Sequence, residues 1–416
     1  PSIYKDYVLT MLFLKVVSDV WQDHHDQYKA QYGDHPELIA EMLKNERFVL
    51  PTSASFYALH ALRHTPGNGE RIDKALHAIE EANLGKLRDV FQDISFNSNK
   101  LGDEQQKNDI LRHLLEDFAK PELNLRESRV GQLDVIGNAY EFLIKNFAST
   151  SGKKAGEFYT PPEVSTLMAR LMDPQPGDEI CDPTCGSGSL LMKCGRLIRQ
   201  RTGARKYALY GQEAIGSTWA LAKMNMFLHG EDNHRIEWGD TIRNPKLLDG
   251  AASLKHFDIV VANPPYMGGK GMNGRLSTWA KETYPNSKSD LFAMFIERNL
   301  DFLRPGGRMA VVLPQGRFNN ASDKRVREYI AERCRILAVV GLHSDTFKPH
   351  TGTKTSVRFL QKWRDDAEGE TVGDYRIFFA TSQKSGKDNS GEYIYLDREG
   401  KRDKNLQGKH IGMEVF

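Results

Sequence analysis

The chain has few cysteines, no long apolar run and almost no net charge. Its 416 residues include four cysteines, and so low a number suits a reducing cytoplasm. We find no apolar run long enough to span a bilayer and no signal peptide, and we therefore expect no membrane partner. The formal net charge of +2 neither requires nor excludes nucleic acid, because the placement of charges matters more than their sum.

Two further kinds of site are missing from the sequence. Cys181 and Cys185 stand close together, but no second Cys or His pair stands at ligand spacing, so we expect free thiols and no metal. No Gly-x-x-x-x-Gly-Lys-Ser/Thr loop occurs in the 416 residues, which excludes a phosphate-loop ATPase from them.

The pattern of apolar residues changes near residue 150, which predicts two main domains. Before that point apolar residues such as Tyr4, Val8 and Met11 recur at helical spacing, so we expect an all-α domain over residues 1–150. The segment Ser149–Gly156 is small, polar and glycine-rich, which indicates a flexible hinge.

Beyond this hinge, short β-rich runs alternate with helical patterns over residues 151–365. Such alternation is typical of an α/β domain with a doubly wound, mostly parallel sheet. The last two runs have no clear helix between them, so we expect the final strand to insert antiparallel. The predicted strands are Glu179–Asp182, Ala208–Gln212, Arg235–Trp238, Phe257–Ala262, Arg308–Leu313, Ile336–Leu342 and Thr355–Trp363. Residues 366–416 give only a weak strand signal. We expect them to be a truncated C-terminal extension, and the start at Pro1 likewise points to a longer polypeptide.

A glycine-rich turn, Asp182-Pro-Thr-Cys-Gly-Ser-Gly-Ser-Leu190, follows the first predicted strand and precedes a helix. Glycines there let the backbone approach a ligand closely, and N–H groups at the helix start receive negative charge. This geometry suits the carboxylate of S-adenosylmethionine or the pyrophosphate of a dinucleotide, and a purely structural turn is the alternative.

Two acidic residues stand at the ends of the next two predicted strands. Glu213 is placed to accept hydrogen bonds from both hydroxyls of a ribose, and a surface glutamate is the alternative. Asp240 is placed to reach the adenine amino group of a cofactor, and a helix cap is the alternative.

The fourth predicted strand ends in Asn263-Pro-Pro-Tyr266, the most specific motif of the chain. The prolines hold the backbone extended and remove N–H donors, which leaves carbonyl oxygens facing whatever enters. The Asn263 side-chain oxygen and the Pro264 carbonyl then accept both hydrogens of a planar amino group. The amine nitrogen becomes more pyramidal, and its lone pair becomes able to attack a methyl group. Tyr266 offers a ring for a base to stack on.

Together these motifs resemble the amino-methyltransferases that act on N6 of adenine in DNA. Phe158-Tyr-Thr-Pro161 precedes the glycine turn and Asn263-Pro-Pro-Tyr266 follows it, as in that group. Three further segments resemble the modification subunits of type I restriction-modification systems: Ser2–Lys15, Gly156–Pro162 and Leu303–Pro314. The resemblance covers roughly residues 1–365 and implies a Rossmann-like S-adenosylmethionine-dependent methyltransferase fold behind a helical N-terminal domain.

The resemblance also implies roles for single residues. The segment around the methionine end of S-adenosylmethionine comprises Glu157, Phe158, Tyr159, Thr160, Pro161 and Pro162, together with Asp182, Gly186, Ser187, Gly188 and Ser189 of the turn. Glu213 falls on the ribose and Asp240 on the adenine. The catalytic set is Asn263, Pro264, Pro265 and Tyr266, and Phe347 faces Tyr266 across the flipped base.

The implied reaction is direct methyl transfer to an adenine flipped out of the duplex. C5-cytosine methylation is excluded because none of the cysteines follows a proline. N4-cytosine methylation, protein-glutamine methylation and a non-catalytic DNA scaffold remain alternatives. The implied partners are double-stranded DNA, a specificity subunit that binds two modification subunits, and a restriction/translocase subunit, all in the cytoplasm. Basic residues after the fifth strand, such as Arg317 and Lys324, are either phosphate contacts or a solvated helix face.

Overall fold

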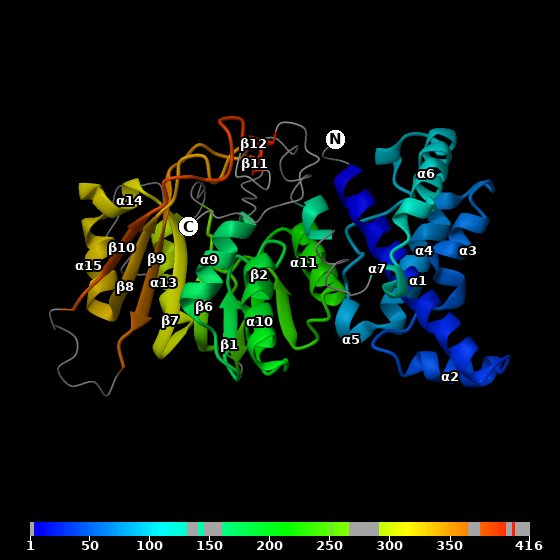
Figure 1. Ribbon diagram of the computed structural model, residues 1–416, viewed down its shortest axis with the longest axis horizontal. Coiled ribbons are helices and arrows are strands. Elements are labelled where there is room, and N and C mark those ends of the chain that lie inside the picture. Colours follow the sequence, from blue (N-terminus) through cyan, green and yellow to red (C-terminus); the bar gives the residue numbers. More distant parts are fainter. Residues whose placement is uncertain are drawn as a thin grey trace. The chain divides into compact units, whose positions relative to one another are not determined.

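The computed structural model describes residues 4–130, 140–144, 160–250, 252–265, 291–364, 375–396 and 402–403. The described residues form two compact units, one within Pro1–Ser151 and Ile215–Asp232 and the other within Gly152–Ala214 and Asn233–Phe416 (Figure 1). Ser149–Gly156, the predicted hinge, lies outside the described residues.

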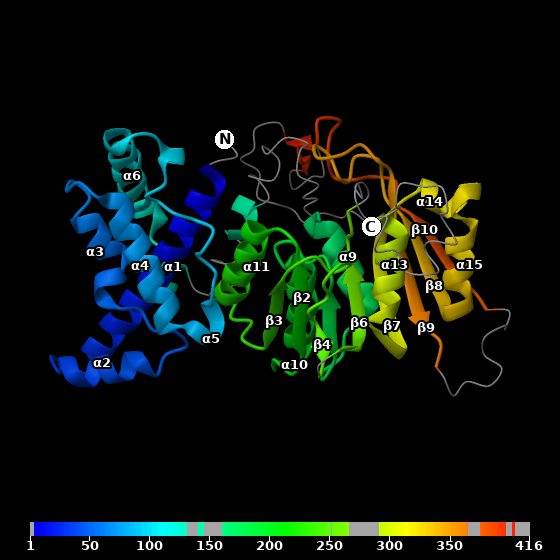
Figure 2. The same cartoon turned by 180° about the vertical axis from the view of Figure 1, so that it is seen from behind.

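Unit 1 is helical, as the apolar spacing predicts (Figure 2). Its helix α1 (Tyr4–Tyr32) spans 29 residues, with Met11 fully buried and Tyr4 44 % exposed. A buried carboxylate on α1 anchors two segments distant in the sequence, since Asp19 accepts hydrogen bonds from the Tyr57 hydroxyl of α3 at 2.6 Å and from the Leu125 N–H at 2.7 Å. None of the described helices combines the length and the apolar character that crossing a membrane requires. The remaining helices before residue 145 are α2 (Pro36–Lys44), η1 (Thr52–Ala54), α3 (Phe56–Ala61), α4 (Asn68–Ala82), α5 (Leu84–Leu87), η2 (Asn99–Leu101), α6 (Glu104–Phe118), η3 (Pro121–Leu123), α7 (Glu127–Val130) and the helical residues 140–144.

Helix α11 (Gly216–Leu228) stands between two strands in the sequence yet belongs to unit 1. Its Phe227 ring lies 5.5 Å from the Phe13 ring, centroid to centroid. The guanidinium group of Arg47 lies 4.9 Å from the centroid of the same ring. The sequence pattern assigns residues 151–365 to a single domain, whereas the packing of α11 groups it with the N-terminal helices.

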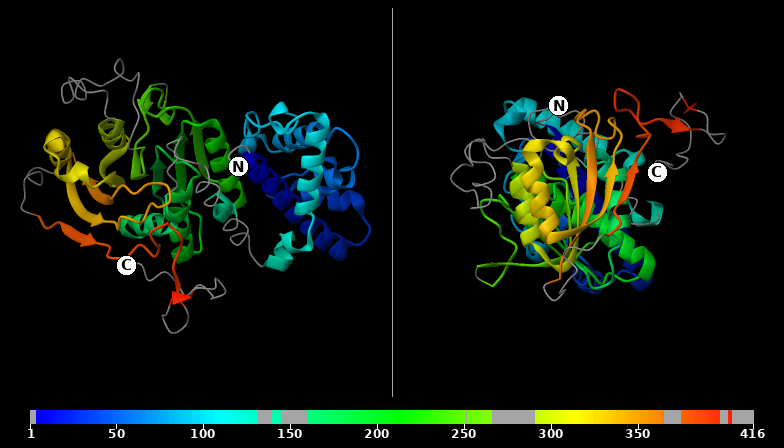
Figure 3. Two further views of the ribbon diagram at one scale, coloured as in Figure 1. Left: turned by 90° about the horizontal axis from the view of Figure 1, so that it is seen from above. Right: turned by 90° about the vertical axis from the view of Figure 1, so that its left-hand side faces the viewer.

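Within its described residues, unit 2 is built on an eight-stranded sheet of order β10-β8-β9-β7-β6-β1-β2-β3, with helices on both sides (Figure 3). The strands of this sheet are β1 (Glu179–Asp182), β2 (Ala208–Glu213), β3 (His234–Trp238), β6 (Phe257–Ala262), β7 (Leu303–Pro314), β8 (Cys334–Gly341), β9 (Thr355–Lys362) and β10 (Phe378–Thr381). Two short pairs lie outside it, β4 (Leu248–Asp249) with β5 (Ser253–Leu254) and β11 (Tyr395–Leu396) with β12 (Arg402–Asp403). The helices are α9 (Pro162–Met172), α10 (Ser189–Thr202), α13 (Leu291–Asp301), α14 (Gly316–Asn319), η4 (Ala321–Asp323) and α15 (Lys324–Arg333).

The directions of the strands confirm the predicted α/β architecture. Strands β3, β2, β1, β6 and β7 pair in parallel. Strand β9 inserts antiparallel between β7 and β8, as expected from the missing helix before it. Strand β10 pairs in parallel with β8 and extends the sheet beyond residue 365. Its Phe378 and Phe379 are 62 % and 70 % exposed, and a strand without alternating burial leaves no period in the sequence.

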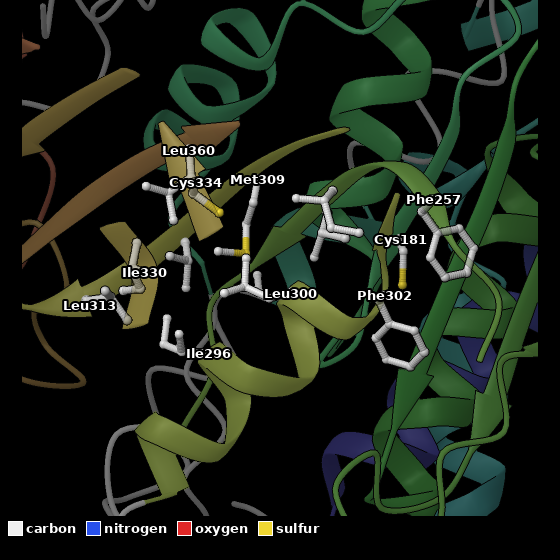
Figure 4. Close-up of a cluster of buried hydrophobic side chains, with 14 of the residues drawn as sticks. Cys181, Phe257, Ile296, Leu300, Phe302, Met309, Leu313, Ile330, Cys334 and Leu360 are labelled. Carbon is white, nitrogen blue, oxygen red and sulfur yellow. The ribbon is translucent and has the colours of Figure 1, made fainter. Parts of the chain in front are cut away.

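The core of unit 2 lies between the sheet and the helices α13 and α15 (Figure 4). The rings of Phe257 and Phe302 meet edge to face there, with centroids 5.8 Å apart. Val260 points into this core, so the neighbouring Ile259 points to the opposite face, and both side chains are fully buried. Burial on both faces explains why the strands read as continuous apolar runs.

The order of the sheet reverses between β1 and β6. The chain adds β2 and β3 on one side of β1 and adds β7 on the other side of β6. Open α/β sheets bind their ligands outside the carboxyl ends of the strands at such a reversal. The fold therefore directs attention to the residues that follow β1 and β6.

A glycine in β2 lets the turn after β1 pack close to the sheet. A Cβ at Gly211 would lie 2.9 Å from both the Cys185 Sγ and the Ile236 Cδ1 atoms. We predict that Gly211→Ala lowers the free energy of unfolding by about 1–3 kcal/mol, as overpacking of a buried site does. In β8, a Cβ of the matched control Gly341→Ala approaches the exposed side chain of Thr381 most closely, at 3.3 Å, and meets the Ala380 carbonyl at an ordinary 3.7 Å, so stability should change by less than about 0.5 kcal/mol. Urea unfolding measures both, and equal stability of the two variants would contradict the packing argument.

Candidate active site

The turn between β1 and α10 is shaped by two glycines in left-handed conformations. Gly186 has a φ of +53° and Gly188, the N-cap of α10, a φ of +79°. A Cβ built at Gly186 meets no atom within 4 Å, so open space lies beside the backbone there. An approachable backbone followed by the N-terminus of a 14-residue helix provides the geometry that binds a carboxylate or phosphate.

Glu213, at the end of β2, is tied to this turn. Its Oε2 atom accepts a hydrogen bond from the Gly186 N–H at 3.0 Å. The backbone adds two links: the Cys185 N–H donates to the Gln212 carbonyl at 3.1 Å, and the Gly239 N–H donates to the Glu213 carbonyl at 2.8 Å. The structure thus brings together the predicted turn and the predicted ribose-binding carboxylate.

Two buried polar residues that belong to no sequence motif hold the loop after β3. Gln212 donates to the carbonyls of Gly239 and Asn244 at 3.1 and 2.9 Å and accepts from the Lys246 N–H at 2.9 Å. Thr241 donates to the Pro183 carbonyl at 2.6 Å. In the sequence, Gln212 is marked only by its position directly before Glu213. Because side chains alternate along a strand, its amide points to the opposite face of the sheet from the Glu213 carboxylate.

Asp182 is almost fully buried at the end of β1. It accepts a hydrogen bond from the Thr184 N–H at 2.9 Å. Burial, together with the negative charge of Glu213, raises the pKa of Asp182 from 3.8 to about 7. The negative charge in this crevice favours a cationic or hydrogen-donating group, whereas the start of α10 favours an anionic one.

The Asn263 side chain is held by a residue far away in the sequence. Its Nδ2 atom donates to the Thr160 hydroxyl oxygen at 3.1 Å, and Asn263 is 8 % exposed. Thr160 stands before α9, whose first turn begins with Pro161 as its N-cap. The structure therefore joins two motifs that the sequence analysis treated separately, at the carboxyl end of β6.

The other predicted site residues have different surroundings. Asp240 accepts hydrogen bonds from the N–H groups of Ile242 and Arg243 at 2.9 and 3.0 Å, and so closes a turn over residues 241–243, where no helix begins. Phe347 is 1 % exposed, so its ring offers a base no surface in this conformation. Of the remaining predicted residues, Pro161, Ser189 and Pro264 are buried and Pro162, Ser187 and Pro265 half-buried, whereas Glu157, Phe158, Tyr159 and Tyr266 lie outside the described residues.

The basic residues after β7 serve the local fold in part. Arg317 pairs with the buried Asp323 at 3.0 Å, and its guanidinium lies 5.0 Å from the Phe292 ring. Lys324 is exposed and lies 3.5 Å from Glu328. Among the described residues, no three His, Cys, Asp or Glu side chains gather as metal ligands.

Two protein families match this chain. The N-6 DNA Methylase family matches residues 131–399, and the HsdM N-terminal domain matches residues 1–118. The methylase subunit of the type I restriction enzyme MpnII of Mycoplasma pneumoniae is 32 % identical, over 87 % of this chain and 73 % of its own length. That of MjaVIII of Methanocaldococcus jannaschii is 30 % identical, over 82 % of this chain and 60 % of its own length.

Solved structures agree with these matches. The methyltransferase subunit of a type I restriction-modification system from Streptococcus thermophilus has a TM-score of 0.73 at 27 % identity and covers 94 % of this chain and 84 % of its own. A modification subunit of a putative type I restriction enzyme from Vibrio vulnificus shares the fold, with a TM-score of 0.59 at 19 % identity over 97 % of this chain and 91 % of its own. The predicted methyltransferase fold with a helical N-terminal region is confirmed. On its motifs, its fold and its relatives, this chain belongs to the N-6 DNA methylase family and, within it, to the methylase subunits of type I restriction enzymes.

Proposed function

We propose that the chain transfers a methyl group from S-adenosylmethionine to N6 of an adenine flipped out of double-stranded DNA. The observation that carries the proposal is the hydrogen bond from Asn263 to Thr160 at the carboxyl end of β6. Strand β6 pairs directly with β1, whose following turn is the candidate cofactor cradle. An amine-accepting side chain and a cofactor cradle are thus neighbours at the reversal of the sheet.

The residues of the cradle fit S-adenosylmethionine, which when bound supplies a methyl group activated by a sulfonium. Its methionine end carries both an ammonium and a carboxylate. Asp182 and Glu213 favour the cationic parts, and the N-terminus of α10 favours the carboxylate. We infer that Glu213 also binds the ribose, and that Asp240 reaches the adenine from the start of its turn. Glu157–Pro162 would line the methionine end.

Asn263 would orient and activate the target amine. Because its Nδ2 atom donates to Thr160, the amide is held in one rotamer, with Oδ1 directed elsewhere as an acceptor. The Pro264 carbonyl is the second acceptor, followed by Pro265, which has no N–H. Two fixed acceptors position the amine for in-line attack, so catalysis rests on orientation and electrostatics, without a covalent intermediate. Tyr266, with Phe347 after a rotation of its side chain, would stack on the base.

The same proposal includes partners. The curated relatives are subunits of multisubunit enzymes, and this chain spans 60 % to 73 % of the length of the two relatives described above. We infer that two copies act in the cytoplasm on one specificity subunit, which selects the DNA site, and that a restriction/translocase subunit joins them. The near-neutral charge supports this inference, because autonomous DNA binding relies mainly on neutralised phosphates.

The first prediction from the proposed function concerns the cofactor. Glu213→Ala should weaken S-adenosylmethionine binding by about 10–100-fold, since loss of a charged hydrogen-bonding partner typically costs about 1.5–3 kcal/mol. The matched control is Glu237→Ala in β3, a glutamate that pairs with Arg235 at 2.7 Å, and it should bind normally. Titration calorimetry decides, and equal affinity of both variants would remove Glu213 from the cofactor site.

The second prediction separates chemistry from cofactor binding. Asn263→Ala should slow methyl transfer by about 10²–10³-fold and leave S-adenosylmethionine affinity unchanged, because it removes an acceptor for the target amine only. Thr160→Val should cause a smaller loss, since it removes a contact that holds the amide but keeps the acceptor oxygen. The control Asn233→Ala removes an amide that donates to the Tyr207 carbonyl at 2.6 Å, near the amino ends of β2 and β3, and should methylate normally. Wild-type turnover by Asn263→Ala in single-turnover assays would refute the assignment.

The third prediction concerns assembly. The full-length subunit alone should show little site-specific methylation of genomic DNA, and adding its specificity protein should restore it. Methylation is measured with radiolabelled cofactor, followed by sequencing of the modified sites. Robust sequence-specific activity of the lone subunit would refute the partnership and indicate a stand-alone methyltransferase.

A further inference from the structure

The segment after β10 folds into a tight hairpin. The Asp388 N–H donates to the Glu392 carbonyl at 2.9 Å, and the Ile394 N–H donates to the Gly386 carbonyl at 2.8 Å. One carboxylate oxygen of Asp388 accepts hydrogen bonds from the N–H groups of Ser390, Gly391 and Glu392. These internal bonds make the hairpin, residues 385–394, a rigid platform in a part of the chain where the sequence gives only a weak strand signal.

The hairpin packs against the loop between β8 and β9, which contains Phe347. Gly391 has a φ of +96°, and a Cβ there would lie 2.6 Å from the Pro349 nitrogen. Lys348 donates from its side chain to the Asn389 carbonyl at 3.0 Å. Only a glycine permits this close approach of two backbones.

Lys387 of the hairpin is buried at the centre of the contact, at 8 % exposure. Its Nζ atom donates to the carbonyls of Thr346 and Lys348 at 2.6 and 3.1 Å, the two residues that flank Phe347. The same atom lies 3.7 Å from the Glu163 carboxylate. A single ammonium group therefore holds the backbone on both sides of Phe347.

Glu163 carries the connection to the segment that holds Asn263. It is 5 % exposed, lies in the first turn of α9 and also accepts a hydrogen bond from the Tyr393 hydroxyl at 3.2 Å. Three residues earlier stands Thr160, the partner of Asn263. Through Glu163 and Lys387, the hairpin links the segment that holds the amine acceptor to the loop that carries Phe347.

We propose that Lys387 is a positioning residue of the methyl-transfer site, which fixes the start of α9 and the Phe347 loop relative to each other. The inference rests on the proposed function for its catalytic consequence. Burying an ammonium and a carboxylate is expensive, and apolar residues of similar size often stabilise a fold as well or better. The four polar contacts of Lys387 and Glu163 join three segments: the hairpin, the Phe347 loop and the start of α9. We infer that they serve to fix the relative positions of these segments.

The test compares Lys387→Met with Lys362→Met in the full-length subunit assembled with its specificity partner. Lys362 also donates to two carbonyls, of Leu300 and Leu303 at 2.9 and 2.8 Å, but at the amino end of β7. Both variants should lower the unfolding temperature. Only Lys387→Met should slow single-turnover adenine methylation, on the order of tenfold or more, because small displacements of a reacting geometry cost that much. The dissociation constant for S-adenosylmethionine should change less than the rate.

Hydrogen exchange reports on the linkage without any catalysis. The N–H groups of His350 and Thr351 donate to the Phe347 carbonyl at 3.0 and 3.1 Å, so loosening of this loop accelerates their exchange. Lys387→Met should accelerate exchange there and in the first turn of α9, and Lys362→Met in neither. If Lys387→Met fails to fold, Glu163→Gln takes its place, because it keeps the size of the side chain and removes its charge. It must then accelerate exchange in the same two segments, by a smaller factor. Where both variants fold, the double variant should be no worse than Lys387→Met.

The possible outcomes separate the two proposals. Faster exchange in both segments with slower methylation supports the positioning role. Reduced thermal stability with wild-type exchange and wild-type rate overturns it and leaves a structural lysine. If the wild-type assembly methylates no adenine, the proposed function fails, and the exchange pattern alone then supports or overturns the linkage through Lys387.

Discussion

Parallel pairing of β1 with β6 is the constraint on which the candidate site depends. Parallel neighbours end at the same edge, so the pairing of Cys181 with Val260 brings the glycine turn and Asn263 to adjacent positions. The strands are buried on both faces, and a shift of register would turn their side chains to the wrong side. The packing of the sheet therefore fixes where the site residues lie. The loops that carry them need only a few additional contacts with one another.

Those connections are mostly hydrogen bonds between loops. Gln212 and Thr241 bind main-chain carbonyls of neighbouring loops, and Glu213 binds the N–H of Gly186. Such bonds replace the hydration that each polar group loses on burial. A buried polar group left without a hydrogen bond destabilises the fold by more than the net stabilisation that the bond provides. These loops are thus held in place by the protein's own contacts, which agrees with the proposed reaction, since that reaction depends on positioning.

The sequence alone predicts the parts of the molecule that follow a period or a motif. Strands β1 and β6 have the bounds that their apolar runs indicate, and Asn263 stands where the motif places it. Three features were beyond its reach for physical reasons. Helix α11 is apolar around its circumference, so no period indicates its partner. Strand β10 is an exposed edge without alternation. Lys387 looks like a surface lysine, because its burial depends on Glu163 and on carbonyls that no pattern places beside it.

The C-terminal hairpin has a consequence for dissecting the protein into fragments. A boundary after β9, where the recognisable motifs end, would leave Glu163 buried without the ammonium group of Lys387 and the hydroxyl of Tyr393. It would also strip β8 of its edge neighbour and expose a row of unpaired backbone groups to other chains. An autonomous catalytic fragment must therefore extend at least to Ile394, so that the length of the folding unit is set by a polar contact and not by the last recognisable motif.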